Sequence, residues 1–301
     1  MGLIKKYYHW LHGKWPAGTV EKLPEVGEDG ATNVPGIRVV GDLGGIPLLK
    51  FSSDTGAKAV RAILAEPDFA GQRSGKADGV VDLLIVGGGV SGVSAAIEAS
   101  KAGLSYVLYE SGELFSTVVN FPKGKPIYTY PTEMEPAGGI QYSEKADVKE
   151  SLLEEMREQA AEHGIEAMAA RVVMVGRQGN ELVVSLEKGG EQRALRCVIA
   201  IGRSGNYRKM GIPGEGLDKV SNRLHDPAEF AGKTVMVVGG GDSAAEAAVA
   251  LAESGAEVTV SYRGDALTRP KPENVERVEA LAEGNKWNLD LKLGVEPVRI
   301  T

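Results

Sequence analysis

Hydrophobic positions along the chain repeat one succession twice. A largely apolar run at 81–86, interrupted only by Asp82, ends in a cluster of glycines, a helical segment of small residues follows, and a second apolar run occupies 106–109. The same order returns with an apolar run at 234–238 and a strand-like segment at 257–260, in which valines alternate with polar residues, again separated by glycines and an alanine-rich segment. Such runs favour buried strands, and the small residues between them favour a helix packed closely on the sheet. The chain is therefore predicted to be an α/β protein with two β-turn-α-β units.

The segment between the two units changes from a helical to an alternating pattern. Residues 147–163 are expected to form a helix, because Asp147 and Glu150 have the spacing of a capping box and apolar residues recur on one face. The polar, glycine-rich stretches 22–33 and 65–79 are expected to be linkers. Three apolar runs, separated by turns that contain glycine, predict a small β-meander at 171–175, 181–187 and 193–201.

The first unit has the spacing Gly-x-Gly-x-x-Gly, with Gly87, Gly89 and Gly92 between strand and helix. In this setting the first glycine makes a tight turn, the second lets the backbone approach a pyrophosphate, and the third lets the helix pack on the strand. Glu110 ends the next strand, where a carboxylate accepts hydrogen bonds from ribose hydroxyls. The pattern predicts a dinucleotide site, and a glycine-rich turn without a ligand is the alternative.

The second unit has Gly239 and Gly241, with Ala244 in the third place, which the motif allows. Ser261 stands where an acid would hold an unphosphorylated ribose, and Arg263 follows two residues later. An acid would repel a 2′-phosphate whereas an arginine would bind one, so NADP(H) is expected rather than NAD(H). An exposed loop charge is the alternative for Arg263. Two nearby cations are further candidates for the same phosphate: Arg269 and Lys271.

Composition and charge remove several classes of function. Of the 301 residues, 43% are hydrophobic and 25% are charged, as in a soluble protein with a folded core. The 34 basic and 41 acidic residues give a net charge of −7, so no basic surface for nucleic acid is expected. The single cysteine, Cys197, excludes a disulfide framework, a Cys-x-x-Cys pair and a multi-cysteine metal site, and with four scattered histidines no metal site is expected. Cys197 lies in an apolar run and is expected to be an inert core residue.

The N-terminus carries no pattern of a signal peptide, and no stretch is apolar enough to span a membrane, so a cytoplasmic protein is expected. Residues 3–15 combine aromatic and apolar residues with lysines. They could form an interfacial helix on a membrane or on a partner. A terminal helix packed on its own domain is the alternative.

Taken together, these motifs resemble the pyridine nucleotide–disulfide oxidoreductase superfamily. The likeness rests on the first fingerprint with Glu110, the helix and meander, the strand 197–202 that ends at Gly202, and the second fingerprint. Within the superfamily the chain is most similar to thioredoxin-reductase-like flavoproteins, including the bacillithiol disulfide reductase branch. Residues 120–122 and 128–131 resemble that branch near the flavin, and 211–216 resemble the start of the NADPH domain. The resemblance implies two Rossmann-like dinucleotide-binding domains, one for FAD and one for NADP(H).

The segment 34–43 resembles the flavin-binding Gly-Asp motif of that family, in which the aspartate, here Asp42 after Gly41, holds the ribityl chain. Residues 53–59 resemble the start of the helix that follows it, which is directed at the flavin pyrimidine. In the family this segment closes the chain, whereas here it precedes the first fingerprint, as in a circular permutation. The linker at 65–79 could connect it to the first apolar run. A plain turn at Gly41 is the alternative.

The chain departs from the family in its cysteines and in its length. No cysteine pair precedes the second fingerprint, where residues 222–226 stand instead, and Ser91 occupies the place of the cysteine in the bacillithiol branch. The second domain lacks the later strands and the second glycine motif of the family. It is therefore expected to be either abbreviated or cut from a longer protein.

The resemblance implies an FAD-dependent oxidoreductase that passes a hydride from NADPH to FAD. Without a cysteine pair, electrons are expected to leave the flavin directly for a small-molecule or protein acceptor, and no catalytic residue is assigned. Whether the protein forms a homodimer stays open. The competing class is a non-catalytic nucleotide-binding sensor or regulatory module at the N-terminus of a larger protein. A thioredoxin-type disulfide reductase is disfavoured by the cysteine count.

The expected organisation is an N-terminal extension at 1–32, an FAD domain at 33–212 and an incomplete NAD(P)H domain at 213–301. The FAD domain divides into the permuted Gly-Asp segment at 33–64, the linker at 65–79, and the fingerprint, helix and meander at 80–212. The residues expected to bind FAD are Gly41, Asp42, Gly87, Gly89, Val90, Ser91, Gly92, Glu110 and Gly202. Those expected to bind NADP(H) are Gly239, Gly241, Asp242, Ser243, Ala244, Arg263 and Arg269.

Overall fold

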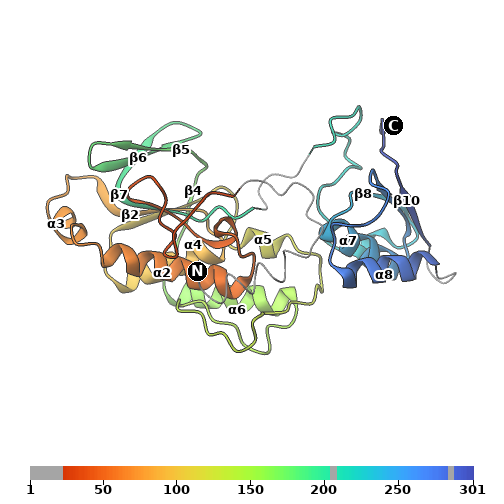
Figure 1. The fold of residues 1–301 in the computed structure, drawn as a ribbon, viewed down its shortest axis with the longest axis horizontal. Helices are drawn as coiled ribbons and strands as arrows, with labels where there is room; N and C mark the ends of the chain where they lie inside the picture. Colours follow the sequence, from red (N-terminus) through yellow and green to blue (C-terminus); the bar gives the residue numbers. More distant parts are fainter. Residues whose placement is uncertain (1–22, 204–208, 284–287) are drawn as a thin grey trace. The chain divides into compact units, whose positions relative to one another are not determined.

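The computed structural model describes residues 23–203, 209–283 and 288–301. These residues form two compact units (Figure 1). The first unit comprises residues 23–119 and 124–203, and the second unit comprises residues 120–123, 209–283 and 288–301. No helix among these residues is long and apolar enough to cross a membrane. The interfacial helix expected at 3–15 lies outside the described residues.

The first unit is built on a seven-stranded sheet of order β4-β3-β2-β7-β6-β5, and β1 also pairs with β7. Its strands are β1 (Ile37–Val39), β2 (Val80–Val86), β3 (Tyr106–Glu110), β4 (Met168–Ala169), β5 (Val172–Gln178), β6 (Glu181–Leu186) and β7 (Glu191–Ile199). Its helices are η1 (Gly41–Gly44), α2 (Leu49–Leu64), α3 (Phe69–Ser74), α4 (Val90–Lys101), α5 (Ser116–Val119) and α6 (Lys149–Glu162).

Strand β7 joins the parallel part of this sheet to the meander. Along one edge it pairs in parallel with β2 over residues 193–199. Along the other edge, residues 191–194 pair antiparallel with β6, and residues 197–199 pair in parallel with β1. β6 and β1 therefore pair with successive parts of the same edge of β7. The strands β3, β2, β7 and β1 are adjacent and parallel at the carboxyl end of β7. The expected meander is confirmed, and it extends the main sheet instead of forming a separate one.

Helices α2 and α4 pack against each other and on the parallel strands. β2 is buried along nearly its whole length, as expected for a parallel strand with both faces covered. The two helices meet backbone to backbone at Gly56, where an added Cβ would lie 2.1 Å from the carbonyl oxygen of Ser91. Glycine at this position therefore sets how closely α2 can approach α4.

Helix α6 begins at Lys149, so the expected capping box with Asp147 as the first residue is wrong. The carbonyl oxygen of Asp147 accepts a hydrogen bond from the amide of Ile127 (2.7 Å), and this pairing holds the backbone before the helix in an extended conformation. Glu150 accepts instead from an amide outside the helix, that of Gly124 (3.1 Å).

Helix α2 begins at Leu49, ahead of the expected start near Ser53. Ser53 and Asp54 look like a helix start in the sequence, but both are buried inside the helix. The hydroxyl of Ser53 donates to the carbonyl oxygen of Ile140 (2.8 Å), and Asp54 Oδ1 accepts from the amide of Ala137 (3.0 Å). These polar residues therefore fasten a distant loop to α2.

The stretch 65–79 is not an open linker, because it contains α3 and Phe69 of that helix is buried. Arg73 and Lys76 pair with Asp82 of β2 at 3.1 and 2.6 Å. The Asp82 side chain is 1% exposed, so these cations compensate an otherwise buried charge. The stretch is thus attached to the sheet that it precedes.

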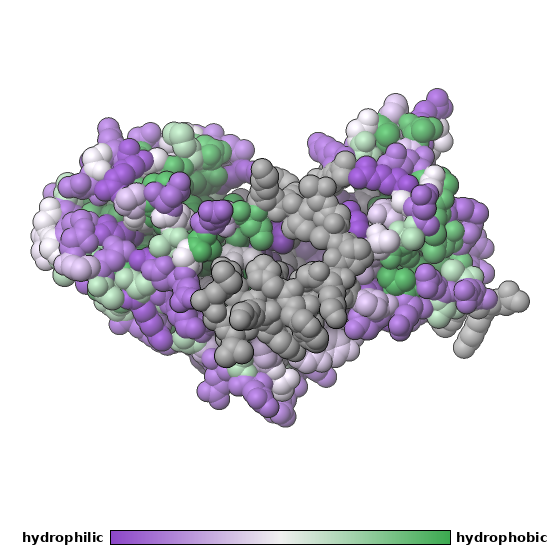
Figure 2. All heavy atoms as spheres, viewed as in Figure 1, coloured by the Kyte–Doolittle hydropathy of each residue, from purple (hydrophilic) through white to green (hydrophobic). Residues whose placement is uncertain are grey.

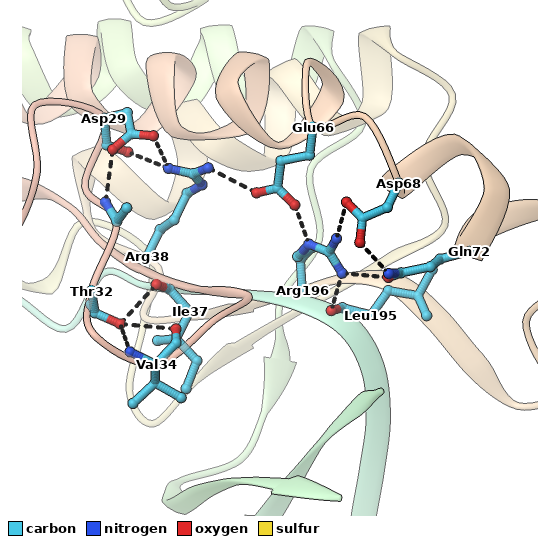
Figure 3. A network of polar contacts seen from close by, with 11 residues as sticks. Asp29, Thr32, Val34, Ile37, Arg38, Glu66, Asp68, Gln72, Leu195 and Arg196 are labelled. Carbon is cyan, nitrogen blue, oxygen red and sulfur yellow. Dashed lines mark hydrogen bonds and ion pairs between the residues drawn. The ribbon is translucent and has the colours of Figure 1, made fainter. Parts of the chain in front are cut away.

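A network of ion pairs fastens the segment before β1 to the sheet (Figure 3). Glu66 accepts from Arg38 at 2.8 Å and from Arg196 of β7 at 2.6 Å. Arg38 also pairs with Asp29, and Arg196 donates to Gln72 Oε1 (2.8 Å). Both arginine side chains are less than a tenth exposed, so each is held by several partners at once.

The second unit has a three-stranded parallel sheet of order β10-β9-β8. Its elements are η2 (Pro227–Phe230), β8 (Thr234–Val238), α7 (Asp242–Glu253), β9 (Glu257–Tyr262), α8 (Pro272–Glu283) and β10 (Leu289–Leu293). Both helices pack on one face of the sheet, over a core that includes Ala248, Val249, Leu251, Val258, Val260 and Val278. The visible surface of both units is mainly hydrophilic, with smaller hydrophobic areas (Figure 2). The expected α/β class with two β-turn-α-β units is confirmed.

Candidate functional site

The first glycine turn connects β2 to α4, and its geometry requires glycine at two positions. Gly87 follows β2 with φ +105°, and its amide donates to the carbonyl oxygen of Tyr109 (2.8 Å). A Cβ added at Gly92 would lie 1.8 Å from the carbonyl oxygen of Gly87, so any side chain there would push α4 away from the turn. The structure therefore contains the tight turn and the close helix packing that the sequence predicts.

Gly89 differs from these two glycines, because no described residue beyond its chain neighbours lies within 4 Å of a Cβ built there. It is the N-cap of α4, with φ −74° and ψ −175°, values open to any residue. The protein itself therefore does not require glycine at this position. The first amides of a helix have no partner inside the helix, so open space beside them suits an anion. This arrangement fits the pyrophosphate of a dinucleotide.

Glu110 ends β3 beside the glycine turn and is 9% exposed. Its Oε2 accepts from the amide of Gly88 (2.6 Å) and its Oε1 from the amide of Gly112 (2.8 Å), so two backbone donors fix the carboxylate. Together with residues such as Leu114 and Ile165 it lines a cavity of about 410 Å³. Oε1 also accepts from the hydroxyl of Ser111 (3.4 Å), whereas Oε2 has a second lone pair with which to accept from a ribose hydroxyl. Cavity and carboxylate together fit the adenosine half of FAD.

The Gly-Asp segment, distant in sequence, lies beside this first turn. Gly41 has φ +71°, and a Cβ added there would lie 2.6 Å from Ser91 Oγ in α4. The amide of Gly41 donates to Thr55 Oγ1 (3.1 Å), and Asp42 Oδ1 accepts from Ser52 Oγ (3.2 Å). Helix α2 therefore holds both residues of the motif, and Gly41 lies against the start of α4.

Burial raises the pKa of Asp42, and the hydrogen bond from Ser52 and the charge of Arg203 lower it only in part. The carboxylate is thus desolvated without a full set of donors. A hydroxyl that donates to it would stabilise its charged form. Asp42 therefore fits the expected role of holding a ribityl chain.

The four adjacent parallel strands end at one edge of the sheet, and the expected residues gather there. Gly41 follows β1, Gly202 follows β7 with φ +59°, Gly87 follows β2, and Glu110 ends β3. In open α/β sheets, ligands bind outside the carboxyl ends of the strands. The Gly-Asp segment therefore reaches the same edge as the first fingerprint.

The second glycine turn connects β8 to α7 in a similar way. Gly239 has φ +145°, and a Cβ added there would lie 3.3 Å from that of Ala244. Gly241 is the N-cap of α7, and a Cβ built on it would have no described neighbour within 4 Å, as at Gly89. This turn can also admit a phosphate.

Asp242 and Ser243 begin α7 but differ in their surroundings. Asp242 Oδ1 accepts from the amide of Lys271 (2.7 Å) and from Asn274 Nδ2 (2.8 Å), so it connects α7 to the start of α8. Ser243 is exposed. The structure gives Asp242 a role within the protein, and a contact of either residue with a nucleotide stays a prediction.

Strand β9 runs to Tyr262, beyond its expected end at Val260. This changes which residue of the second unit corresponds to Glu110 of the first. The amide of Gly239 donates to the carbonyl oxygen of Ser261 (3.0 Å), which repeats the hydrogen bond that Gly87 makes in the first turn. The residue after the acceptor is Glu110 in the first unit and Tyr262 in the second. Tyr262 is therefore the counterpart of Glu110, and the assignment of Ser261 to this position is wrong.

Ser261 is instead buried at the end of β9, where its hydroxyl donates to the carbonyl oxygen of Val295 (3.0 Å). The Tyr262 ring lies against the turn, because a Cβ added at Gly240 would be 2.4 Å from it. Arg263 follows and is exposed, with Nη1 3.8 Å from Glu296 Oε1. Two further candidate cations are also exposed: Arg269 and Lys271.

Cys197 lies in β7 between its parallel neighbours β2 and β1. It is fully buried, and burial raises the pKa of its thiol to about 12. A thiol with this pKa carries almost no thiolate near neutral pH. The expected core position of Cys197 is confirmed, and its inertness stays a prediction. Within the described part of the chain, no group of three or more His, Cys, Asp or Glu residues is arranged to hold a metal ion.

Sequence reasoning missed several residues at these two turns. Ser52 and Thr55 support the Gly-Asp segment, but they belong to no motif, and polar residues in the first turns of an otherwise apolar helix are the only signal. Tyr262 was missed because the strand was expected to end at Val260, whereas it runs to Tyr262. Glu296 comes from beyond β10 and has no sequence signal at all.

Comparison with known proteins places these turns in a family. The family model for pyridine nucleotide-disulphide oxidoreductases matches residues 84–293, which include both glycine turns, whereas the Gly-Asp segment precedes the match. A ferredoxin–NADP reductase of Ignicoccus hospitalis is 34% identical over 190 residues, 63% of this chain and 58% of that protein. A bacilliredoxin reductase of Bacillus subtilis is 29% identical over 71% of this chain and 67% of that protein.

The solved structure of a bacillithiol disulfide reductase from Bacillus cereus is similar with a TM-score of 0.64 and 28% identity. The similarity covers 73% of this chain and 70% of that one. The chain thus spans roughly three fifths to two thirds of the length of such relatives. Because the family model covers more than half of the sequence, the chain belongs to the pyridine nucleotide-disulphide oxidoreductase family.

Proposed function

We propose that this chain is an FAD-dependent oxidoreductase that takes a hydride from NADPH and delivers electrons to an external acceptor without a cysteine pair. The observation that carries the proposal is the convergence of Gly89, Glu110 and Asp42 at the carboxyl edge of one parallel sheet. Each of the three has room or unused hydrogen-bonding capacity for a different part of FAD. The names of the relatives, which are reductases, support the same activity.

The residues of the first unit bind and orient FAD in this proposal. The amides at the start of α4 bind the pyrophosphate beside Gly89, and the fixed carboxylate of Glu110 accepts from the adenosine ribose. Asp42, held by Ser52, accepts from the ribityl chain. FAD, when bound, supplies the redox chemistry, and the protein supplies position and exclusion of water.

The second unit binds the pyridine nucleotide. Gly241 at the start of α7 leaves space for the pyrophosphate, and the exposed Arg263 binds the 2′-phosphate. Tyr262 cannot repel that phosphate as a carboxylate would. These features favour NADPH as the hydride donor.

Electrons then leave without passing through a protein thiol. Cys197 is buried with a raised pKa, and the sequence contains no second cysteine. The acceptor is therefore a small molecule or a protein that reacts with reduced FAD directly. The competing function, a nucleotide-binding sensor without redox activity, is separated from this one by the experiment that follows.

The test is a spectrum of the purified chain after incubation with FAD and removal of the excess. We expect stoichiometric FAD with the absorption of an oxidised flavin, which anaerobic NADPH bleaches and an added acceptor restores. Gly241→Val should abolish bleaching by NADPH but not by dithionite, because the nucleotide turn is changed and the flavin turn is not. A colourless protein that binds NADPH would contradict the proposal and support the sensor.

A further inference from the structure

The end of β9 lacks the carboxylate that the corresponding position of the first unit has. Tyr262 occupies the position of Glu110, and its ring lies against the glycine turn. In the first unit, Glu110 is the group that can accept from a ribose hydroxyl. A site with only Arg263 in this region would favour a 2′-phosphate and offer nothing to a free 2′-hydroxyl.

A carboxylate nevertheless reaches this region from a different part of the chain. Glu296 follows β10, and the residue before it is fastened to the end of β9. The amide of Val295 donates to the carbonyl oxygen of Tyr262 (3.1 Å), and its carbonyl oxygen accepts from the hydroxyl of Ser261 (3.0 Å). The backbone that carries Glu296 is therefore held beside the position that Tyr262 fills.

Glu296 and Arg263 form a loose pair that a ligand can separate. Their closest charged atoms, Oε1 and Nη1, are 3.8 Å apart, and the side chains are 63% and 56% exposed. An exposed pair of this kind contributes little to stability. Both groups can therefore turn to a bound nucleotide at small cost.

We infer that Glu296 is a specificity-determining residue of the second turn, which supplies from beside β10 the carboxylate that Tyr262 lacks. Its charge opposes the 2′-phosphate that Arg263 attracts, and its oxygens can accept from a free 2′-hydroxyl. The turn thus carries one determinant for each form of the nucleotide, and its preference for NADPH is limited by Glu296. The inference rests on the proposed function, because it assumes that this turn binds a pyridine nucleotide.

The experiment measures how Glu296→Gln changes the binding of two probes to the full chain. Adenosine 2′,5′-bisphosphate and adenosine 5′-monophosphate differ only in the 2′-phosphate, so the ratio of their dissociation constants isolates that group. We expect the variant to bind the bisphosphate about three- to tenfold more tightly at low salt, because it lacks the negative charge of Glu296 that repels the 2′-phosphate. The gain is modest because water weakens this repulsion in an exposed site. The monophosphate should bind equally or up to about threefold more weakly. The gain should shrink as salt is added.

Glu253→Gln is the matched control. Glu253 lies on α7 in the same unit, is 48% exposed, and pairs with Arg277 at 2.9 Å, so its replacement changes the net charge equally. An equal shift of the ratio in both variants would show that net charge is responsible and overturn the inference. A ratio in Glu296→Gln within twofold of the unmodified chain would overturn it as well. Failure of the unmodified chain to bind either probe would contradict the proposed nucleotide site itself, which distinguishes the two failures.

Discussion

Replacement of Gly89 by valine separates a requirement of the protein from a requirement of its ligand. A Cβ at this position would meet no described neighbour within 4 Å, and the backbone has an extended conformation that valine adopts readily. The variant is therefore expected to fold. Valine in place of glycine at a helix N-cap should cost about 1 kcal/mol of stability.

The cost to FAD binding should be much larger than the cost to folding. A side chain at Gly89 fills the space that a pyrophosphate needs in order to reach the first amides of α4. A charge-assisted hydrogen bond contributes about 1.5–3 kcal/mol, so the loss of two such bonds amounts to about 3–6 kcal/mol. FAD affinity should then fall by about 10²- to 10⁴-fold.

The assay is titration of the FAD-free protein with FAD, followed by flavin fluorescence, with urea unfolding of the same samples. Gly176→Val is the control, because Gly176 lies in β5 with a similarly open surrounding and no link to the turn. Gly92→Ala should behave in the opposite way and lose stability, since its Cβ would lie 1.8 Å from a carbonyl oxygen. A Gly89→Val protein that keeps FAD at unchanged affinity would refute the assignment of this turn.

Four other substitutions test the remaining assignments. Asp42→Asn should weaken FAD binding about tenfold, because a ribityl hydroxyl loses a charged acceptor; unchanged affinity in a fluorescence titration would contradict the role of the Gly-Asp segment. Arg263→Ala should raise the KM for NADPH about tenfold and leave that for NADH nearly unchanged, whereas an equal loss for both would indicate a structural role. Cys197→Ser should retain NADPH-driven flavin reduction in stopped-flow measurements, since burial raises the pKa of the thiol to about 12; a folded, FAD-loaded variant unable to pass electrons on would contradict a thiol-free route. Burial alone would raise the pKa of Asp82, but hydrogen bonds from Lys76 and Ser105 bring it below its ordinary value. The ionised Asp82 side chain therefore stabilises the fold above about pH 4, and this contribution is lost as the pH falls through the lowered pKa. Asp82→Asn should therefore flatten the acid side of the unfolding free energy, and an unchanged pH dependence would show that Asp82 does not contribute.

The sequence predicts the two glycine turns and the meander well because their signals are local. Gly87 has a positive φ that other residues rarely adopt, so a glycine in the sequence indicates the turn. The apolar run before it is enough to identify the strand. The limits of the elements depend on partners elsewhere. The start of α6 moves to Lys149 because the carbonyl oxygen of Asp147 is bound by Ile127, and no pattern within the helix indicates this.

The error at Ser261 has a similar origin. Val260 is the last aliphatic residue before it, but the hydrogen bond from the amide of Gly239 to the carbonyl oxygen of Ser261 shows that the strand continues to Tyr262. In a parallel pair the register determines which side chain faces the turn, and a shift of one residue moves it to the other face. A fingerprint therefore predicts that a turn binds phosphate more reliably than it predicts which residue meets the ribose.

The position of the Gly-Asp segment shows why chain order is a weak constraint on this site. A strand contributes to the ligand edge if its carboxyl end reaches that edge, and β1 does so by pairing with residues 197–199 of β7. The chain then returns through α2 and α3 to β2. Glu66, which lies between these two helices, fixes the connection by pairing with Arg38 of β1 and Arg196 of β7. Because the cost of closing a connection grows only slowly with its length, a segment can enter the sheet before or after the fingerprint with similar stability. What must be kept is the approach of Gly41 to Ser91, where an added Cβ would lie 2.6 Å from the serine hydroxyl, and this contact depends on the packing of α2 on α4 at Gly56.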